Sequence, residues 1–285
     1  MNQQTTSWLL ANARSGSNSA AAIAALEEQL IERGMPVARR IDFPDEQIPD
    51  PELLDENGVD KLIVFTGDGT LNAAITGLAG WGGQVLVLPG GTMNLLSCRL
   101  HGDGATSELI LDRVAAGAMK PVRPLAASCE AGAALAGLLV GPGTAWATVR
   151  EAMRDYDLVG FAQGAGEAVT ETASGARVRV CEPRAGQGDG YPLLEITPSH
   201  RGMVVDGYRS DGAGDMLQHS WALLRRRFRE GPHERLGIVD RILVENCEGE
   251  PIDVLIDGEP RRLGPRAQFT VAACEVDLLA TDHGF

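Results

Sequence analysis

The chain has 285 residues, 44% hydrophobic and 22% charged, a composition typical of globular proteins with roughly two domains. Its formal charge of −14 argues against a nucleic-acid-binding protein, because phosphate backbones are bound by clustered Lys and Arg. The cysteines are far apart and form no CxxC pair, which argues against a zinc site and a disulfide framework: Cys98, Cys129, Cys181, Cys247 and Cys274.

This cysteine usage fits a reducing cytoplasm. The amino terminus lacks a charged and then apolar leader, and no segment approaches the run of about 18 apolar residues that spans a bilayer. We therefore expect a cytoplasmic protein whose contact with a membrane is peripheral, at its inner face.

Residues 1–122 alternate apolar runs with helical patterns, which predicts an α/β domain built on a mostly parallel sheet. Strands are expected at 8–10, 36–41, 61–65 and 85–88. Helices are expected at 71–78, at 107–116, and from Ile23 through Leu30, where Gly34 supplies a stop.

Beyond Pro121 and Pro124 the sequence changes to short, glycine-punctuated runs rich in β-branched residues, so residues 123–270 are predicted to form a mainly β sandwich domain. Such runs occupy 145–149, 177–180, 193–197 and 252–256, and apolar spacing within 211–230 predicts one helix. The segment of about 271–285 is expected to pack back on the first domain.

The segment Thr66-Gly67-Asp68-Gly69-Thr70-Leu71-Asn72 directly follows an apolar strand and opens a helical pattern. Glycines at such a turn allow close approach of the backbone, and the helix amino terminus offers N–H groups to phosphate oxygens. Asp68 is placed to hold a metal or to manage a phosphate-linked proton. Taken alone, the segment also fits a tight turn capped by Asp68 or Thr70.

Two further turns have the same design. Leu88-Pro89-Gly90-Gly91-Thr92-Met93-Asn94 lies one strand later, and Asn12-Ala13-Arg14-Ser15-Gly16 follows the first strand, where a helix cap is the simpler interpretation. Ligands of open α/β sheets bind outside the carboxyl ends of the strands, so these turns are expected to face one nucleotide.

These segments resemble the nucleotide motifs of the diacylglycerol-kinase-like lipid kinases, a family that includes sphingosine and ceramide kinases. The usual Asn-Pro-x-Ser-Gly resembles residues 12–16, Gly-Gly-Asp-Gly-Thr-x-Asn resembles 66–72, and Pro-x-Gly-Thr-x-Asn resembles 89–94. Asp257-Gly258-Glu259 resembles a fourth motif near the carboxyl end. The sequence departs from the family at Ala13, at Thr66, and at Leu95, where many members have aspartate.

The resemblance implies a nucleotide domain, a β-sandwich domain with a lipid pocket, and ATP with Mg²⁺ in the cleft between them. The implied nucleotide contacts are Asn12, Ser15, Gly16, Thr66, Gly67, Asp68, Gly69, Thr70, Asn72, Gly91, Thr92 and Asn94. Asp68 is the implied metal ligand and a catalytic acid. The acidic stretch of Asp206, Asp211 and Asp215 lies where the family often holds a structural magnesium, with turn chemistry as the alternative.

Glu259 is expected to act as the general base toward the lipid hydroxyl, with Asp257 supporting it electrostatically or by holding metal. This role comes from the family motif together with a local argument: Gly258, between two carboxylates after an apolar strand, allows a sharp turn that projects an acid. An ordinary hairpin turn is the alternative, because Asp-Gly is a strong signal for one.

The leading interpretation is ATP-dependent transfer of the γ-phosphoryl group to a lipid hydroxyl, diacylglycerol-like or sphingoid. A soluble-substrate kinase related to NAD kinase, which shares the Gly-Asp-Gly-Thr turn, is a second. A nucleotide- or lipid-binding module without turnover is a third, motivated by Thr66 and Leu95. Residues 225–229, rich in arginine, are either a headgroup contact or a solvated helix face. The sequence does not specify the oligomeric state.

Overall fold

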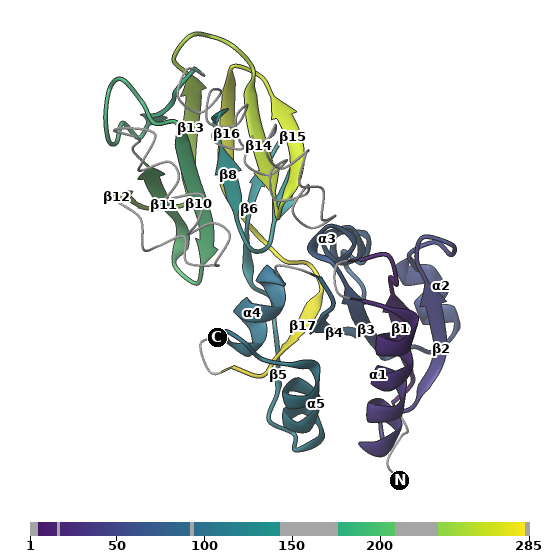
Figure 1. The fold of residues 1–285 in the computed structure, drawn as a ribbon. Helices are drawn as coiled ribbons and strands as arrows, with labels where there is room; N and C mark the ends of the chain where they lie inside the picture. Colours follow the sequence, from purple (N-terminus) through teal and green to yellow (C-terminus); the bar gives the residue numbers. More distant parts are fainter. Residues whose placement is uncertain (1–4, 16–17, 92–93, 143–175, 209–232, 283–285) are drawn as a thin grey trace. The chain divides into compact units, whose positions relative to one another are not determined.

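The protein is described here by a computed structural model that covers residues 5–15, 18–91, 94–142, 176–208 and 233–282 (Figure 1). The backbone divides into two compact units, Met1–Pro124 with Ala273–Phe285, and Leu125–Ala272. The sequence predicts these boundaries after residues 122 and 270, within three residues of the observed ones. Each unit has its own cluster of buried hydrophobic side chains.

The amino-terminal unit contains a six-stranded sheet in the order β2-β1-β3-β4-β17-β5. The parallel strands are β1 (Ser7–Ala11), β2 (Val37–Asp42), β3 (Lys61–Thr66), β4 (Gln84–Pro89) and β17 (Asp277–Ala280), and β5 (Lys120–Val122) is the antiparallel edge. The predicted mostly parallel sheet is therefore confirmed. A strand from the end of the chain, β17, lies between β4 and β5.

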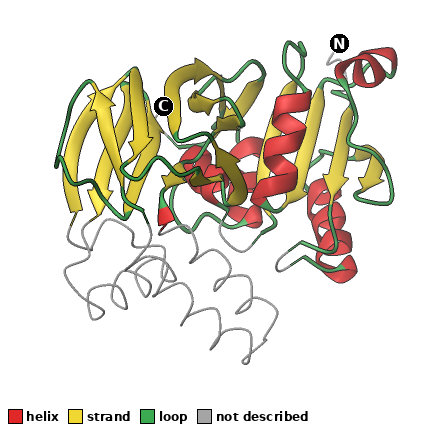
Figure 2. Cartoon of the chain, turned by 90° about the horizontal axis from the view of Figure 1, so that it is seen from above, coloured by secondary structure: helices red, strands yellow, loops and turns green. Residues whose placement is uncertain are grey.

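Helices flank this sheet (Figure 2). They are α1 (Ala20–Glu32), α2 (Pro51–Glu56), α3 (Asp68–Gly77), α4 (Leu95–His101) and α5 (Ser107–Ala115). Buried side chains of α1 and α5 share one cluster with Leu9, Ile63 and Leu86 of the strands. Alternate strand residues such as Leu10 and Val64 are buried too, so both faces of the sheet are covered, as parallel sheets require.

Helix α3 begins at Asp68, three residues before the position that the hydrophobic pattern predicted, Leu71. Gly67 adopts the extended backbone of an N-cap residue, with φ −77° and ψ 166°, and Asp68 is an acidic residue in the first turn, where it interacts favourably with the helix dipole. The glycine-rich segment is therefore in large part the first turn of a helix.

The carboxyl-terminal unit consists of two sheets, in the orders β12-β11-β10-β8-β14-β15 and β7-β6-β16-β13-β9. The strands are β6 (Leu125–Cys129), β7 (Gly132–Ala134), β8 (Leu138–Val140), β9 (Val178–Glu182), β10 (Leu193–Ser199), β11 (Gly202–Tyr208), β12 (His233–Val239), β13 (Arg241–Asn246), β14 (Ile252–Ile256), β15 (Glu259–Leu263) and β16 (Arg266–Ala273). One buried cluster takes side chains from both sheets, so the two sheets pack face to face as a sandwich. The strand expected at 145–149 and the helix expected within 211–230 lie outside the described residues.

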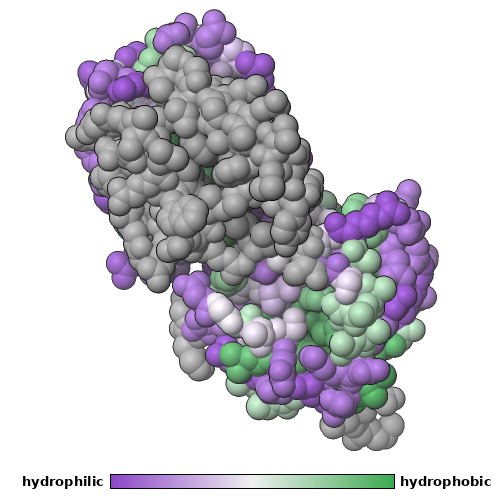
Figure 3. Space-filling model, viewed as in Figure 1, coloured by the Kyte–Doolittle hydropathy of each residue, from purple (hydrophilic) through white to green (hydrophobic). Residues whose placement is uncertain are grey.

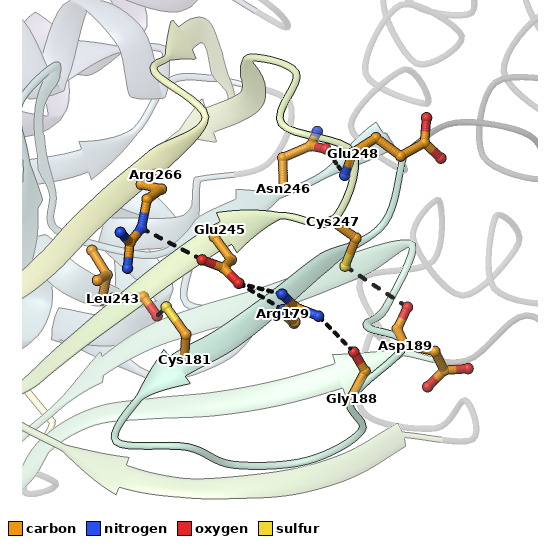
Figure 4. A network of polar contacts seen from close by, with 10 residues as sticks. All are labelled: Arg179, Cys181, Gly188, Asp189, Leu243, Glu245, Asn246, Cys247, Glu248 and Arg266. Atoms are coloured by element: carbon orange, nitrogen blue, oxygen red, sulfur yellow. Dashed lines mark hydrogen bonds and ion pairs between the residues drawn. The ribbon is translucent and has the colours of Figure 1, made fainter.

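A polar network crosses the five-stranded sheet (Figure 4). The Arg179 guanidinium donates to Glu245 at 2.7 Å, and Arg266 approaches the second oxygen of the same carboxylate at 3.4 Å. These contacts, Arg179 first, hold the pKa of Glu245 below its usual value. The three residues lie opposite one another on adjacent strands, so the network is a cross-strand row that supports the sheet.

The face drawn in Figure 3 shows both hydrophilic and hydrophobic areas among the described residues. The large hydrophobic side chains that are exposed in the described part of the chain are Ile31, Leu53, Leu109 and Ile238. Within the described residues, no helix is both long and apolar enough to cross a membrane.

Candidate active site

The strand order of the amino-terminal sheet changes direction between β1 and β3. The chain leaves β1 for β2 on one side, and β3 and β4 lie on the other. Because these strands are parallel, the residues that follow them, Asn12, Gly67 and Gly90, lie at the same edge of the sheet. Open α/β sheets bind ligands at such a switch point, outside the carboxyl ends of the strands.

The three turns at this edge are packed at the van der Waals limit. A Cβ atom placed on Gly91 would lie 2.8 Å from the Cα of Gly67, and one placed on Gly67 would lie 2.4 Å from the Ser15 Oγ. A Cβ atom on Gly90 would lie 2.7 Å from the backbone nitrogen of Thr66. Only glycine fits at these positions without a shift of its neighbours, and the turns therefore form one continuous surface.

Two buried asparagines join the first turn to the second. Asn12 accepts a hydrogen bond from the backbone N–H of Arg14 at 2.9 Å, and its Nδ2 lies 3.4 Å from the Thr70 Oγ1. Asn18 Nδ2 donates to the backbone oxygens of Asn12 and Phe65, at 3.3 and 3.0 Å. The sequence analysis missed Asn18, because its partner Phe65 lies on a strand far along the chain.

Asp68 and Asn94 shape the third turn. The Asp68 Oδ1 accepts a hydrogen bond from the backbone N–H of Leu95 at 3.0 Å, which ties the start of α4 to the start of α3. Asn94 has left-handed backbone, with φ 52°, and its side-chain oxygen accepts from the N–H of Gly91 at 2.6 Å. The contact between Asp68 and Leu95 uses only the backbone of Leu95, so the departure from the family's aspartate leaves it intact.

The remaining predicted nucleotide contacts have these positions. Thr66 is buried at the end of β3, and its hydroxyl donates to the carbonyl of Gly67 at 3.2 Å. Gly69 and Thr70 lie in the first turn of α3, and the Asn72 side chain is 3.5 Å from the Thr76 hydroxyl. Gly16 and Thr92 lie outside the described residues.

The acidic residues proposed as metal ligands are only partly described. Asp211 and Asp215 lie outside the described residues, and Asp206 is buried on β11 in an ion pair with Arg235. Across the part of the chain that is described, no group of three or more His, Cys, Asp or Glu residues is arranged to hold a metal ion. Of Asp68, Asp211 and Asp215, Asp68 is therefore the one whose position the structure gives.

The Asp257-Gly258-Glu259 segment forms the turn between β14 and β15, with Ile256 opposite Glu259. Asp257 and Gly258 both have positive φ, 47° and 91°, as in the two-residue hairpin turn considered as the alternative. The two carboxylates have different surroundings. Asp257 is buried and accepts the backbone N–H groups of Leu135, Ala136 and Gly137 at 2.8 to 2.9 Å, whereas Glu259 is exposed.

Comparison with known proteins bears on this arrangement. Residues 6–127 match the diacylglycerol kinase catalytic domain. This segment belongs to the diacylglycerol kinase catalytic-domain family. The matched residues include all three turns, so the resemblance stated from the motifs is confirmed. No curated protein matches the sequence.

Solved structures show the same fold over the whole chain. A diacylglycerol kinase from Bacillus anthracis superposes with a TM-score of 0.59 at 15% sequence identity, covering 98% of each chain. A candidate diacylglycerol kinase from the same organism superposes with a TM-score of 0.64, again at 15% identity and 98% of each chain. At this identity the likeness shows the fold alone, and the fold includes the β-rich carboxyl-terminal unit.

Proposed function

We propose that this member of the diacylglycerol kinase family transfers the γ-phosphoryl group of ATP to the hydroxyl of a lipid. The observation that carries the proposal is the contact of three polar turns at the switch point, where Gly67, Gly91 and Ser15 meet. Phosphoryl transfer depends on positioning and charge stabilisation. A surface of glycine backbone and hydroxyl groups at strand ends is suited to both.

In this proposal, the phosphates lie against the amino terminus of α3, where the unpaired backbone N–H groups of a helix favour anions. The hydroxyls of Ser15 and Thr70 add hydrogen bonds, and Asn12 and Asn94 keep the turns in place.

Mg²⁺ fits this site as an ion brought in with the nucleotide. Mg²⁺ is usually held by one or two carboxylates together with substrate phosphates, and Asp68 supplies one carboxylate in the first turn of α3. Bound there, Mg²⁺ would neutralise charge on the triphosphate.

Glu259 is the proposed general base toward the lipid hydroxyl. It is exposed, whereas Asp257 is engaged with backbone N–H groups and is better suited to hold the turn than to accept a proton. A base must come within about 3 Å of the hydroxyl that it deprotonates. In this proposal the acceptor lipid binds the carboxyl-terminal unit, and contact with the membrane is reversible. Vesicle co-sedimentation of a variant with Arg225, Arg226 and Arg227 all replaced tests whether these arginines contribute to that contact.

A second candidate function is nucleotide or lipid binding without turnover, favoured by Leu95 at the position where many family members have aspartate. A third is phosphorylation of a soluble acceptor such as NAD. The geometry of the three turns is compatible with both of these functions, because the turns are proposed to bind the nucleotide and do not specify the acceptor.

Transfer of radiolabelled phosphate from ATP separates these functions. Diacylglycerol, monoacylglycerol, ceramide and a sphingoid base in detergent micelles are tested beside NAD, each with Mg²⁺ and with excess EDTA. Labelling of one lipid that EDTA abolishes supports the proposal. Labelling of NAD alone favours the soluble-substrate kinase, and ATP binding without any labelled product favours the binding module.

A further inference from the structure

His101, the last residue of α4, is buried, with a relative exposure of 1%, and both of its ring nitrogens have partners. Nε2 lies 2.8 Å from the backbone carbonyl of Val87, and Nδ1 lies 3.0 Å from the Thr281 hydroxyl. A carbonyl can only accept, so Nε2 carries the proton. The neutral imidazole then accepts at Nδ1 from Thr281.

Val87 lies in the part of β4 that has no pairing with β17. Pairing of β17 with β4 covers Gln84 and Val85 and goes no further. His101 supplies a donor to the Val87 carbonyl two residues later, beyond the pairing with β17, although β3 still pairs with β4 there. A buried carbonyl that loses such a donor retains its desolvation cost, so this bond matters to the end of β4.

Val87 lies just before the turn that carries Gly90 and Gly91, and α4 starts just after that turn. Gly90 and Gly91 therefore lie between β4 and α4, and contacts at both ends of α4 affect their position. The Leu95 N–H is held by Asp68 at one end of α4, and His101 is held by Val87 at the other. The Leu100 carbonyl also accepts the backbone N–H groups of Thr281 and Asp282, at 3.0 and 3.2 Å, so α4 stays attached to the segment after β17 when the second contact is lost. Loss of that contact removes the hydrogen bond between α4 and β4 and loosens the position of Gly90 and Gly91, which lie between them.

We propose that His101 is a positioning residue for the nucleotide site: its neutral ring fastens α4 to β4 and so keeps Gly91 against Gly67. The inference rests on the proposed function, since it assigns His101 to the same nucleotide surface. His101 itself does not touch substrate in this proposal. It acts through Gly90 and Gly91, which lie between β4 and α4.

The surroundings of His101 keep it uncharged. Burial, the largest cause, lowers its pKa from 6.5 to about 4, and the Val87 carbonyl opposes this shift. Arg113, whose guanidinium donates to the His101 carbonyl at 2.8 Å, lowers the pKa further, and Asp282 raises it. The pKa of His101 is depressed while the ring is bonded to Val87. The His101–Val87 contact therefore has its full stability above about pH 6.5, and this stability falls as the pH falls toward about 4.

The test compares His101→Leu, His101→Gln and wild type. Leucine fills the site without a donor, and we expect the KM for ATP to rise about tenfold, with little change in the KM for lipid. Glutamine restores an N–H donor without titrating near neutral pH, so it is expected to recover most of the ATP affinity. Equal KM values for His101→Leu and wild type would overturn the inference, and so would a glutamine variant as impaired as the leucine variant.

Hydrogen exchange of the segment 88–98 gives a readout that does not require turnover. In wild type, protection should fall by up to about tenfold per pH unit below about pH 6.5, because opening takes up one proton. In His101→Gln it should stay flat after correction for intrinsic exchange. Thr281→Val, which keeps the bond to Val87, should lower protection less than His101→Leu. A wild-type profile that is flat with pH contradicts the inference.

The two readouts separate the inference from the proposed function. If wild type shows no ATP binding and no phosphate transfer, the proposed function fails, while the exchange experiment still decides whether His101 fastens the turn. If ATP binds but the segment 88–98 exchanges identically in all variants, the proposed function stands and the inference is wrong.

Discussion

The turn at Asn94 and the turn at Asp257 contain the only two described residues other than glycine that have positive φ, 52° and 47°. In the amino-terminal unit, the strained residue stands beside glycines that leave no room for a side chain. In the carboxyl-terminal unit, it supplies a buried carboxylate that holds three backbone N–H groups. The turn at Asn94 requires glycines without side chains, whereas the turn at Asp257 requires the Asp257 carboxylate. Adding a side chain should therefore damage the first of these turns, and removing one should damage the other.

The largest effect is expected from added atoms at Gly91. In Gly91→Val the Cβ would lie 2.8 Å from the Cα of Gly67, which is backbone and cannot rotate away. We expect ATP affinity to fall by more than about 100-fold, because the three turns must separate. Isothermal titration calorimetry measures this.

Gly77→Ala in α3 is the matched control, since a Cβ atom there meets nothing within 4 Å. It should bind ATP as wild type does. Wild-type affinity in a folded Gly91→Val protein would show that nucleotide does not bind at this edge of the sheet.

Removal of a side chain is expected to damage the turn at Asp257. Asp257→Ala leaves three N–H groups without their acceptor, at a cost of about 4 kcal/mol in the free energy of unfolding, since each buried unpaired group costs about 1–3 kcal/mol. Asp253→Ala, at a half-exposed carboxylate 3.6 Å from Arg262, should cost under about 1 kcal/mol. Similar urea midpoints for the two variants would contradict a structural role for Asp257.

The contrast also shows which parts of the molecule the sequence predicts. Lys61–Thr66 was predictable as a strand because a short continuous apolar run is typical of strands that are buried on both faces of a parallel sheet. The glycine turns were predictable because each follows such a strand. Helices α2 and α4 have 6 and 7 residues, too few to show a period. Asn94 precedes α4 and is a residue type common at helix starts, but its side-chain oxygen accepts from the Gly91 N–H and makes no cap hydrogen bond.

Contacts between residues far apart in the sequence limit how much of the candidate site can be predicted from the sequence. Asn18 reaches Phe65 across 47 residues, and His101 reaches Thr281 across 180. Neither residue belongs to a motif, and their importance arises only when the strands are assembled. In the carboxyl-terminal unit, the motif was visible from the sequence, but the burial of Asp257 beside an exposed Glu259 depends on the distant strand β8 and its preceding loop.

Glu259 lies next to the same turn as Asp257, but its substitution should affect turnover and leave stability unchanged, whereas substitution of Asp257 should lower stability. Glu259→Gln is expected to lower lipid phosphorylation by about 100-fold, the lower end for loss of a general base, without changing the urea midpoint or ATP affinity. Glu250→Gln, at an exposed position in the preceding loop, is the control and should retain turnover. A Glu259→Gln enzyme with wild-type turnover would remove this residue from catalysis.

The smallest effect is expected at Leu95, the position that departs most from the family motif. Leu95 meets Asp68 through its backbone N–H at 3.0 Å, a contact that any residue makes, so the side chain is not needed to hold the first turn of α4. Leu95→Asp should therefore change ATP affinity by less than about fivefold, since a charge near a helix start is typically worth a few tenths of a kcal/mol to about 1 kcal/mol. Turnover is the more telling measurement. If Leu95→Asp converts a protein that binds ATP without transfer into one that phosphorylates lipid, the natural chain is a binding module and the missing carboxylate is the reason. An unchanged, measurable rate in both proteins would show that the glycine turns and Glu259 suffice for transfer without it.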